Sequence, residues 1–234
     1  MKTKGYIYSN QIPMFGHKDI IGYGTDNFYV KEIERDLANE TIIKNHYSHK
    51  IFNNSYIHLG IFIDGEFLGV LQYGHLMNNN SVGNIVKGTE NGEAIELNRM
   101  WLDDRAERNS ESISISYSFK YLKGKFSKVK WVQSFADERC GGFGIVYQAC
   151  SFSYYGEHLS EFYEFEGQIY HKIMFTNEGR SASNSEKAKY LRKNKNKAKK
   201  TKLRQFRYIK FLHTKTKKYC LLKEQPYLKH YNGD

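Results

Sequence analysis

A helix-forming segment enclosed by two strand-forming segments limits the fold of this chain more than any other feature. Residues 94–102 (AIELNRMWL) and 129–136 (VKWVQSFA) are predicted to be strands. Between them, residues 111–122 are predicted to form a helix that Asn109 or Ser110 can cap. A strand, a helix and a second strand in this order predict a mixed sheet with helices packed on it, in the α/β or α+β class.

The rest of the chain adds strands and helices to this unit. Strands are predicted at 56–63 and 67–75 around an Asp64-Gly65 turn, and in a hairpin over 161–176 that turns at Glu166-Gly167. Helices are predicted over 29–45, over a short segment from Gly144, and from a capping box at 183–186 to about residue 204. Segments 206–212 and 219–222 are predicted to close the chain as a second hairpin, whereas residues 1–28 show little periodicity.

Basic residues are concentrated near the C-terminus. Between Arg180 and Lys218 there are 16 lysines and arginines and one acid, Glu186, whereas the remainder of the chain has 20 basic and 24 acidic residues. Such a segment is typical of nucleic-acid binding, although a solvated tail is the simpler alternative. We therefore expect a core at 1–178 and a basic helix and hairpin at 179–234, packed on the core or continuous with it. The side chains expected to contact double-stranded DNA are Lys193, Lys195, Lys197, Lys199, Lys200 and Arg204.

Cysteine usage and hydropathy indicate an intracellular protein. Cys140, Cys150 and Cys220 are odd in number and widely spaced, which predicts neither a disulfide framework nor a cysteine zinc site and favours a reducing cytoplasm. No apolar run approaches the roughly 20 residues of a membrane span, and the N-terminus does not resemble a signal peptide.

Two polar segments in the first half of the chain are candidates for chemistry. His46, Tyr47 and His49 lie in a loop after a predicted helix, where they can act as bases or metal ligands, or simply form a hydrogen-bonded surface loop. Charged and polar groups such as Glu96 and Arg99 lie on both predicted faces of strand 94–102, which indicates either a functional strand or an edge strand.

Two further segments follow predicted strands. Residues 105–112 place two arginines beside a helix N-terminus, which suits a phosphate or pyrophosphate but is also compatible with an ordinary cap. Residues 134–147 contain Asp137 at a strand end, a glycine-rich turn and Tyr147 in a short helix. Ligands bind at such strand ends in open α/β sheets. Cys140 in the turn is a reactive thiol or only a small residue.

Taken together, these segments resemble the Mom family of bacteriophage DNA-modification proteins, which are similar to GCN5-related N-acetyltransferases. The resemblance covers roughly residues 30–215 and is carried by NHYSH, ELNRMWLDD…RNSES, WVQSFADERCGGFGIVYQACSFSYYG and LRKNKNKAKKTKLRQFRYIKF. It implies a mixed central sheet flanked by helices, with strand 94–102 and the helix after it holding the pyrophosphate of acetyl-CoA. The loop 103–110 departs from the Q/R-x-x-G-x-G/A pattern common in acetyltransferases, because it has no glycine.

The resemblance also implies site residues. The expected catalytic residues, which we predict to converge on one pocket, are His46, Tyr47, Arg99, Asp137 and Tyr147. The expected cofactor-binding residues are Arg105, Arg108, Asn109, Ser110 and Ser112. The family's link to iron makes His46, Tyr47 and Asp137 the expected iron ligands.

The activity that the resemblance implies is conversion of adenine in DNA to N6-carbamoylmethyladenine, which protects the DNA from host restriction enzymes in the host cytoplasm. Adenine N6 is paired in the major groove, so such an enzyme must flip the base into a pocket. Two alternatives stay open at this point. One is a protein or small-molecule N-acetyltransferase with a basic tail, and the other is a DNA-binding protein without enzymatic activity.

Overall fold

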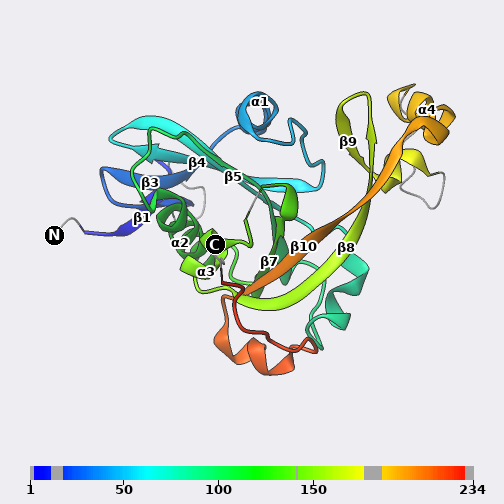
Figure 1. Ribbon diagram of the computed structural model, residues 1–234. Coiled ribbons are helices and arrows are strands. Elements are labelled where there is room, and N and C mark those ends of the chain that lie inside the picture. The colour runs from blue at the N-terminus through cyan, green and yellow to red at the C-terminus, as the bar shows by residue number, and fades with distance from the viewer. Residues whose placement is uncertain (1–2, 12–17, 141, 177–185, 230–234) are drawn as a thin grey trace.

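A single ten-stranded sheet forms the centre of the computed structural model, which describes residues 3–11, 18–140, 142–176 and 186–229 (Figure 1). The strand order is β1-β2-β3-β4-β5-β6-β7-β10-β8-β9. The strands are β1 Gly5–Tyr8, β2 Ile20–Gly24, β3 Phe28–Glu32, β4 Ser55–Ile63, β5 Glu66–Gly74, β6 Ala94–Leu102, β7 Trp131–Asp137, β8 Ser153–Phe165, β9 Gln168–His171 and β10 Lys199–Phe211. The α-helices are α1 Arg35–Asn45, α2 Ser110–Lys125, α3 Ile145–Ala149 and α4 Glu186–Lys193. Short 3₁₀ helices are η1 Asn79–Asn84, η2 Glu138–Cys140, η3 Lys172–Phe175, η4 Lys195–Lys197 and η5 Thr214–Tyr219.

The sheet is antiparallel except at its centre, where β6 and β7 run parallel. Parallel neighbours require a crossover connection, and α2 provides it. The strand, helix and strand that the sequence predicts are therefore the unit around which the sheet is built. The predicted mixed α/β class is confirmed.

Helices cover both faces of the sheet. On one face, Ile115 and Leu122 of α2 pack with Leu71 of β5 in the main core. On the other face, Ala38 of α1 packs against Val70. Because successive residues of a strand point to opposite faces, Val70 packs on the side of α1 and Leu71 packs on the side of α2. Figure 1 shows α1 on one side of the sheet, and α2 and α3 on the other.

The N-terminal segment is more regular than its sequence indicates. Strands β1, β2 and β3 extend the sheet beyond β4, and residues 28–32, which overlap the predicted helix over 29–45, form β3. Helix α1 begins only at Arg35. Tyr29 pairs with Phe62 of β4, and their rings stack at 5.0 Å. Pairing with β4 thus decides the conformation of a segment whose own pattern is ambiguous.

The C-terminal segment corrects two predictions. The basic helix α4 ends at Lys193, and residues 199–211 form β10 rather than the end of a helix or the first arm of a closing hairpin. Residues 219–222 do not pair with it, because Cys220 instead bridges Val86. Of the predicted capping box, only Glu186 lies within the described residues.

Strand β10 lies between β7 and β8 and pairs with both. Phe206 and Tyr208 are fully buried there, so this half of the basic segment belongs to the sheet. Because β10 lies between two strands, hydrogen bonds from both sides satisfy its backbone N–H and C=O groups. The predicted division of the chain after residue 178 stays a prediction.

The hairpin predicted over 161–176 forms, but its first strand is longer and its second strand is shorter than predicted. Its turn lies at Glu166 and Gly167, whose φ angles of 50° and 70° are in the left-handed region. The first arm, β8, begins at Ser153, whereas the second is only Gln168–His171 and continues into η3. In the described part of the chain, no helix combines the length and apolar character needed to cross a bilayer.

The central place of β10 leads to a prediction on stability. Phe206→Ala should lower the free energy of unfolding by about 3–5 kcal/mol, because it opens a cavity in the fully buried core. Lys202→Ala, at an exposed position of the same strand, should change it by no more than about 0.5 kcal/mol. Urea unfolding of the two variants measures the difference. A loss below about 1 kcal/mol for Phe206→Ala would mean that β10 is not a core strand.

Candidate active site

The two parallel strands separate near the middle of the sheet. Strands β6 and β7 pair at only three positions: Ala94 with Trp131, Ile95 with Val132, and Glu96 with Gln133. Beyond Glu96, one further link remains, in which the Ser134 hydroxyl donates to the Leu97 carbonyl at 3.1 Å. From there β6 continues along β5, and β7 continues along β10. The separation opens the sheet at the carboxyl end of β7, where polar side chains can enter.

A β-bulge at Asn98 changes which side chains face this opening. Gln72 of β5 pairs with Arg99, but the next residue, Tyr73, pairs with Leu97, so Asn98 is the extra residue. Glu96 and Arg99 therefore both face the cavity, although simple alternation predicts opposite faces. The bulge explains why polar residues that appear to lie on both faces of this strand collect on one side.

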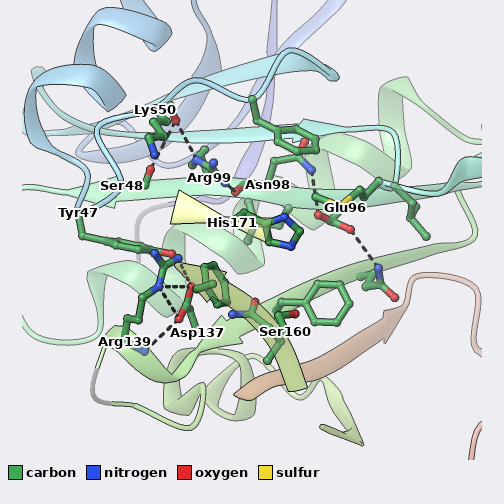
Figure 2. A pocket seen from close by; sticks show the side chains of 18 of the residues that line it. Tyr47, Ser48, Lys50, Glu96, Asn98, Arg99, Asp137, Arg139, Ser160 and His171 are labelled. Carbon is green, nitrogen blue, oxygen red and sulfur yellow. Dashed lines mark hydrogen bonds and ion pairs between the residues drawn. The ribbon is translucent and has the colours of Figure 1, made fainter. Parts of the chain in front are cut away.

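The opening leads into a cavity of ≈ 1130 Å³ (Figure 2). Its walls come from the loop after α1, the turn after β5, strands β6 to β10 and one residue of α4, Lys187. Three of the five predicted catalytic residues line it: Tyr47, Arg99 and Asp137. The structure thus brings together side chains that lie far apart in the sequence.

Asp137, at the end of β7, is held by Arg139 two residues later. The Arg139 Nε lies 3.0 Å from Oδ1 and 2.9 Å from Oδ2, and Nη2 also donates to Oδ2. Burial by itself raises the pKa of Asp137, but the hydrogen bonds and charge of Arg139 outweigh it, so the net pKa lies below its usual value. Asp137 is therefore a buried carboxylate. Its ion-pair partner is Arg139.

Tyr47 lines the cavity beside Arg139, whose guanidinium lies 5.7 Å from the centre of the Tyr47 ring. His46 is 6% exposed and lies behind Tyr47, with 4.2 Å between the ring centroids, whereas Tyr47 is 52% exposed and lines the cavity. The Ser48 backbone N–H donates to His46 Nδ1 at 3.1 Å, which makes Nδ1 an acceptor and places the proton of the neutral ring on Nε2. His46 thus supports Tyr47 from below and does not itself line the cavity.

Arg99 fixes the loop that contains these residues. Its Nε donates to the Lys50 carbonyl at 3.1 Å, and its Nη1 donates to the Asn98 carbonyl at 2.7 Å. The guanidinium lies 5.6 Å from the centre of the Phe52 ring. Burial lowers the pKa of Arg99, but a guanidinium stays charged in proteins. Arg99 therefore adds a fixed positive charge to the cavity and ties the loop after α1 to β6.

The deep end of the cavity contains buried polar atoms that lack partners. Glu96 accepts from Gln133 Nε2 at 3.0 Å and from Asn98 Nδ2 at 3.2 Å, and burial raises its pKa. Among the described residues, neither Gln133 Oε1 nor Arg207 Nε has a hydrogen-bond partner, and both side chains line the cavity. A buried acceptor and a buried donor that both lack partners are costly unless a ligand satisfies them.

Tyr147, the fifth predicted catalytic residue, lies elsewhere. It packs in the core under α2, with its ring 5.3 Å from Phe152 and 5.4 Å from Tyr208. Val132 and Ala136 of β7 belong to that same core, whereas Gln133 and Asp137 line the cavity. Because residues alternate along a strand, Tyr147 is on the opposite face of the sheet. A catalytic role for Tyr147 stays a prediction that this cavity does not support.

The predicted cofactor loop forms the N-terminus of α2. Asn109, at the N-cap position, has a left-handed φ of 71° and makes no side-chain cap bond. The Ser110 amide donates to the Glu107 carbonyl at 3.1 Å, and the Ser112 hydroxyl donates to the Asn109 carbonyl at 2.9 Å. Within the described residues, the amides of Glu111 and Ser112 have no backbone acceptor. These two N–H groups are therefore available to an anion.

The two arginines of the loop differ. Arg105 binds Glu66 at 2.7 Å and Asp103 at 3.0 Å, so surface carboxylates already hold it. Arg108 is exposed and forms no ion pair with the described part of the chain. Of the pair, Arg108 is the better placed to meet a cofactor phosphate.

The residues expected to bind iron do not fit that role as they stand. Both oxygens of Asp137 are engaged by Arg139, and Ser48 occupies His46 Nδ1. Arg99 and Arg139 lie close enough to His46 to lower its pKa, and such positive charges oppose a bound cation. Among the described residues, no group of three His, Cys, Asp or Glu side chains gathers as a metal site.

The basic residues expected to contact DNA run from the end of α4 along the start of β10. Lys193, Lys195, Lys197, Lys199 and Lys200 are exposed. Two of the six candidates have carboxylate partners, since Lys200 binds Glu161 at 2.5 Å and Arg204 binds Glu138 at 2.8 Å. Their DNA contacts stay a prediction, and the lysines without a carboxylate partner among the described residues carry it best.

Sequence reasoning missed several residues of the cavity. The candidate residues taken from the sequence do not include Lys50, Gln133, Arg139 and Arg207, which all line the cavity. A signal existed for Gln133, which is a polar residue inside an apolar strand. No local signal could identify Arg207, because its segment is basic throughout and only the pairing of β10 with β7 brings it beside Glu96.

The mixed central sheet with helices on both faces has the architecture of the GCN5-related N-acetyltransferases. The structure of Arabidopsis thaliana NAA60 in complex with a bisubstrate analogue matches with a TM-score of 0.50 at 11% identity, over 78% of this chain and 96% of that chain. NAA60 in complex with acetyl-CoA gives a TM-score of 0.46 at 11% identity, over 78% and 98%. At such identities the likeness shows the fold alone.

The sequence comparisons identify the family within that class. The model of the Mom protein family matches residues 27–229. The protein named Methylcarbamoylase mom, from Escherichia phage Mu, is 46% identical over 213 residues, which cover 90% of this chain and 87% of that protein. The chain therefore belongs to the Mom family, and the resemblance seen in its motifs is confirmed.

The environment of His46 predicts a dependence of stability on pH. Burial, with smaller contributions from Arg99, His49 and Arg139, lowers the pKa of His46 from 6.5 to about 4. The folded chain thus binds this proton less readily than the unfolded chain. The resulting stability is fully present above pH 6.5 and is lost as the pH falls toward about 4.

Urea unfolding at about pH 7 and about pH 5 checks this expectation. His46→Asn keeps an acceptor for the Ser48 amide and removes the titrating ring, so this variant should lose about 2 kcal/mol less than the parent between the two pH values. Burial also lowers the pKa values of His58, His158 and His171, but these residues titrate in both proteins and cancel in the comparison. Equal losses in the two proteins would show that His46 is not held neutral.

Proposed function

We propose that this enzyme converts adenine in double-stranded DNA to N6-carbamoylmethyladenine, with acetyl-CoA as cofactor, and thereby protects phage DNA from restriction enzymes. Membership of the Mom family and the name of the phage Mu relative support this choice. The observation that carries it is the cavity, which combines aromatic walls, a buried carboxylate and, among the described residues, amide and guanidinium atoms without partners at its deep end.

The cavity has the properties that a flipped base requires. Tyr47, Phe135 and Phe162 provide flat apolar surfaces for stacking, and the volume of ≈ 1130 Å³ exceeds the space that one base fills. Asp137, at the strand end, is ionised, and it would accept a hydrogen bond from the adenine N6–H in exchange for one of its bonds to Arg139. This interaction orients the amino group and increases the nucleophilicity of N6, whose lone pair is otherwise delocalised into the ring.

The deep end suits the amide of the group that is transferred. Gln133 and Asp137 are four residues apart on β7, or about 13 Å, so the two ends of the cavity serve different parts of the reactants. A primary carboxamide presents a carbonyl acceptor and an N–H donor. Arg207 Nε and Gln133 Oε1 are the complementary atoms, and both are buried without a hydrogen-bond partner in the described part of the chain.

Acetyl-CoA is assigned to the other side of the separated strands, at the N-terminus of α2. The amides of Glu111 and Ser112 and the side chains of Arg108 and Asn109 are available there for a pyrophosphate. When bound, acetyl-CoA would supply the two-carbon unit of the product. Acetyl transfer alone would give N6-acetyladenine, so the carbamoylmethyl product also requires a nitrogen donor for the amide and a two-electron oxidant for the bond from N6 to the methyl-derived carbon. The protein's own contribution is to bind acetyl-CoA on one face of the sheet and the base on the other, so that they meet where β6 and β7 part.

Nucleoside mass spectrometry of DNA from cells expressing the chain tests the function. The parent protein should yield N6-carbamoylmethyladenine. Asp137→Asn, which keeps the shape of the side chain and removes its charge, should reduce the product about 100-fold or more, with folding retained. Asp104→Asn, in an exposed turn, is the matched control and should leave the yield unchanged. Unmodified adenine together with acetylated protein would instead identify a protein N-acetyltransferase.

Calorimetry with acetyl-CoA tests the cofactor site. Arg108→Ala should weaken binding about tenfold, because it removes a charged donor to a phosphate. Arg105→Ala should have a smaller effect, since Asp103 and Glu66 already hold that side chain. Lys120→Ala, exposed further along α2, serves as the control. Unchanged affinity in Arg108→Ala, or no binding by the parent, would refute the assignment.

A further inference from the structure

Four positively charged side chains meet at the mouth of the cavity from four different elements. Lys50 comes from the loop after α1, Arg99 from β6, Arg139 from the turn after β7, and Lys187 from α4. Figure 2 shows Lys50 and Arg99 on one side of the space, facing Arg139 and Asp137 on the other. Nothing in the sequence places these residues near one another, so tertiary structure alone creates this cluster.

The charges around the cavity do not balance. Its lining contains five lysines and arginines but only two acids, Glu96 and Asp137. Glu96 lies at the deep end, and Asp137 is engaged by Arg139. Within the described residues, neither Lys50 nor Lys187 forms an ion pair with a carboxylate. The mouth therefore holds an excess of positive charge.

Lys50 and Lys187 approach each other across one ring. Their Nζ atoms lie 4.8 Å and 5.2 Å from the centre of Tyr170. Burial lowers the pKa of the half-buried Lys50, and Lys187, Arg139 and Arg99 lower it further. Like charges held this close repel one another, and an anion bound among them would remove the cost.

We propose that Lys50, Lys187 and Arg139 form a subsite for a phosphodiester of the DNA strand that carries the flipped adenine. This inference rests on the proposed function. Arg99 is a positioning residue. It donates a hydrogen bond to the Lys50 carbonyl, which fixes the loop that carries Lys50, and its charge adds to the positive potential of the subsite. The subsite adjoins Asp137, so a phosphate bound here fixes the backbone while the base enters the cavity.

DNA is favoured over an acidic peptide by the continuity of the charge. Lys187 is followed along the chain by three exposed lysines, Lys193 at the end of α4, Lys197 in η4 and Lys199 at the start of β10. A polymer with regularly spaced phosphates can follow such a series of lysines into the cavity. The phosphates of acetyl-CoA could also bind to such a cluster of positive charges, but we assign them to the N-terminus of α2.

Binding measurements on the full chain test this subsite. The probe is a short fluorescent DNA duplex with one unpaired adenine, titrated at several salt concentrations. Lys50→Gln and Lys187→Gln should each weaken DNA binding about tenfold and reduce the slope of log affinity against log salt by about 0.9, as expected when the protein neutralises one phosphate fewer. Lys50→Arg should retain most of the affinity. Acetyl-CoA affinity, measured on the same samples, should be unchanged and also reports that the variants are folded.

The matched control is Lys189→Gln, on the same helix, where Lys189 pairs with Glu186 at 2.6 Å. It should leave the DNA affinity and the salt slope unchanged. The subsite is overturned if Lys50→Gln and Lys187→Gln bind DNA like the parent, if they lose acetyl-CoA affinity instead, or if an acidic peptide displaces DNA from the parent but not from these variants. Weaker DNA binding by the two variants, together with a parent that yields no modified nucleoside, would keep the subsite and refute the proposed function.

Discussion

The separation of β6 from β7 after Glu96 and Gln133 is the constraint on which the rest of the site depends. Two parallel strands that stayed paired to their ends would leave no space at the centre of the sheet. The bulge at Asn98 belongs to the same feature, because it turns Arg99 to the side that Glu96 already faces. Both strands keep their other neighbour, so each stays anchored in the sheet while the opening forms between them.

The opening also divides the chemistry between two faces. On one face lie Asp137 and the loop after α1, together with an excess of positive charge. On the other face lie α2 and its N-terminus, with the main core beneath. A sheet that is open only at its centre allows a cofactor and a large polymer to approach from opposite sides. That arrangement supports the proposed transfer to DNA.

Part of the basic segment, strand β10, lies inside the central sheet. Strand β10 places Arg207 at the deep end of the cavity and Phe206 in the core on the opposite face, from adjacent positions in the sequence. The same strand begins among the exposed lysines. One segment thus contributes to the core, the cavity and the basic surface, which explains why its composition alone suggested only the last of these.

The sequence by itself determined the central strand–helix–strand unit, the hairpin turns and the family. These features depend on local periodicity, on glycine-containing turns and on motifs that consist of short contiguous segments of sequence. It also located Tyr47, Arg99 and Asp137, because reactive side chains at strand ends and in loops are visible without knowledge of the fold. Tertiary structure alone decided the place of β10, the pairing of Asp137 with Arg139, and the meeting of Lys50 with Lys187. Each of these depends on register between strands or on contacts across the cavity, and such contacts join residues whose separation in the chain carries no information about their separation in space.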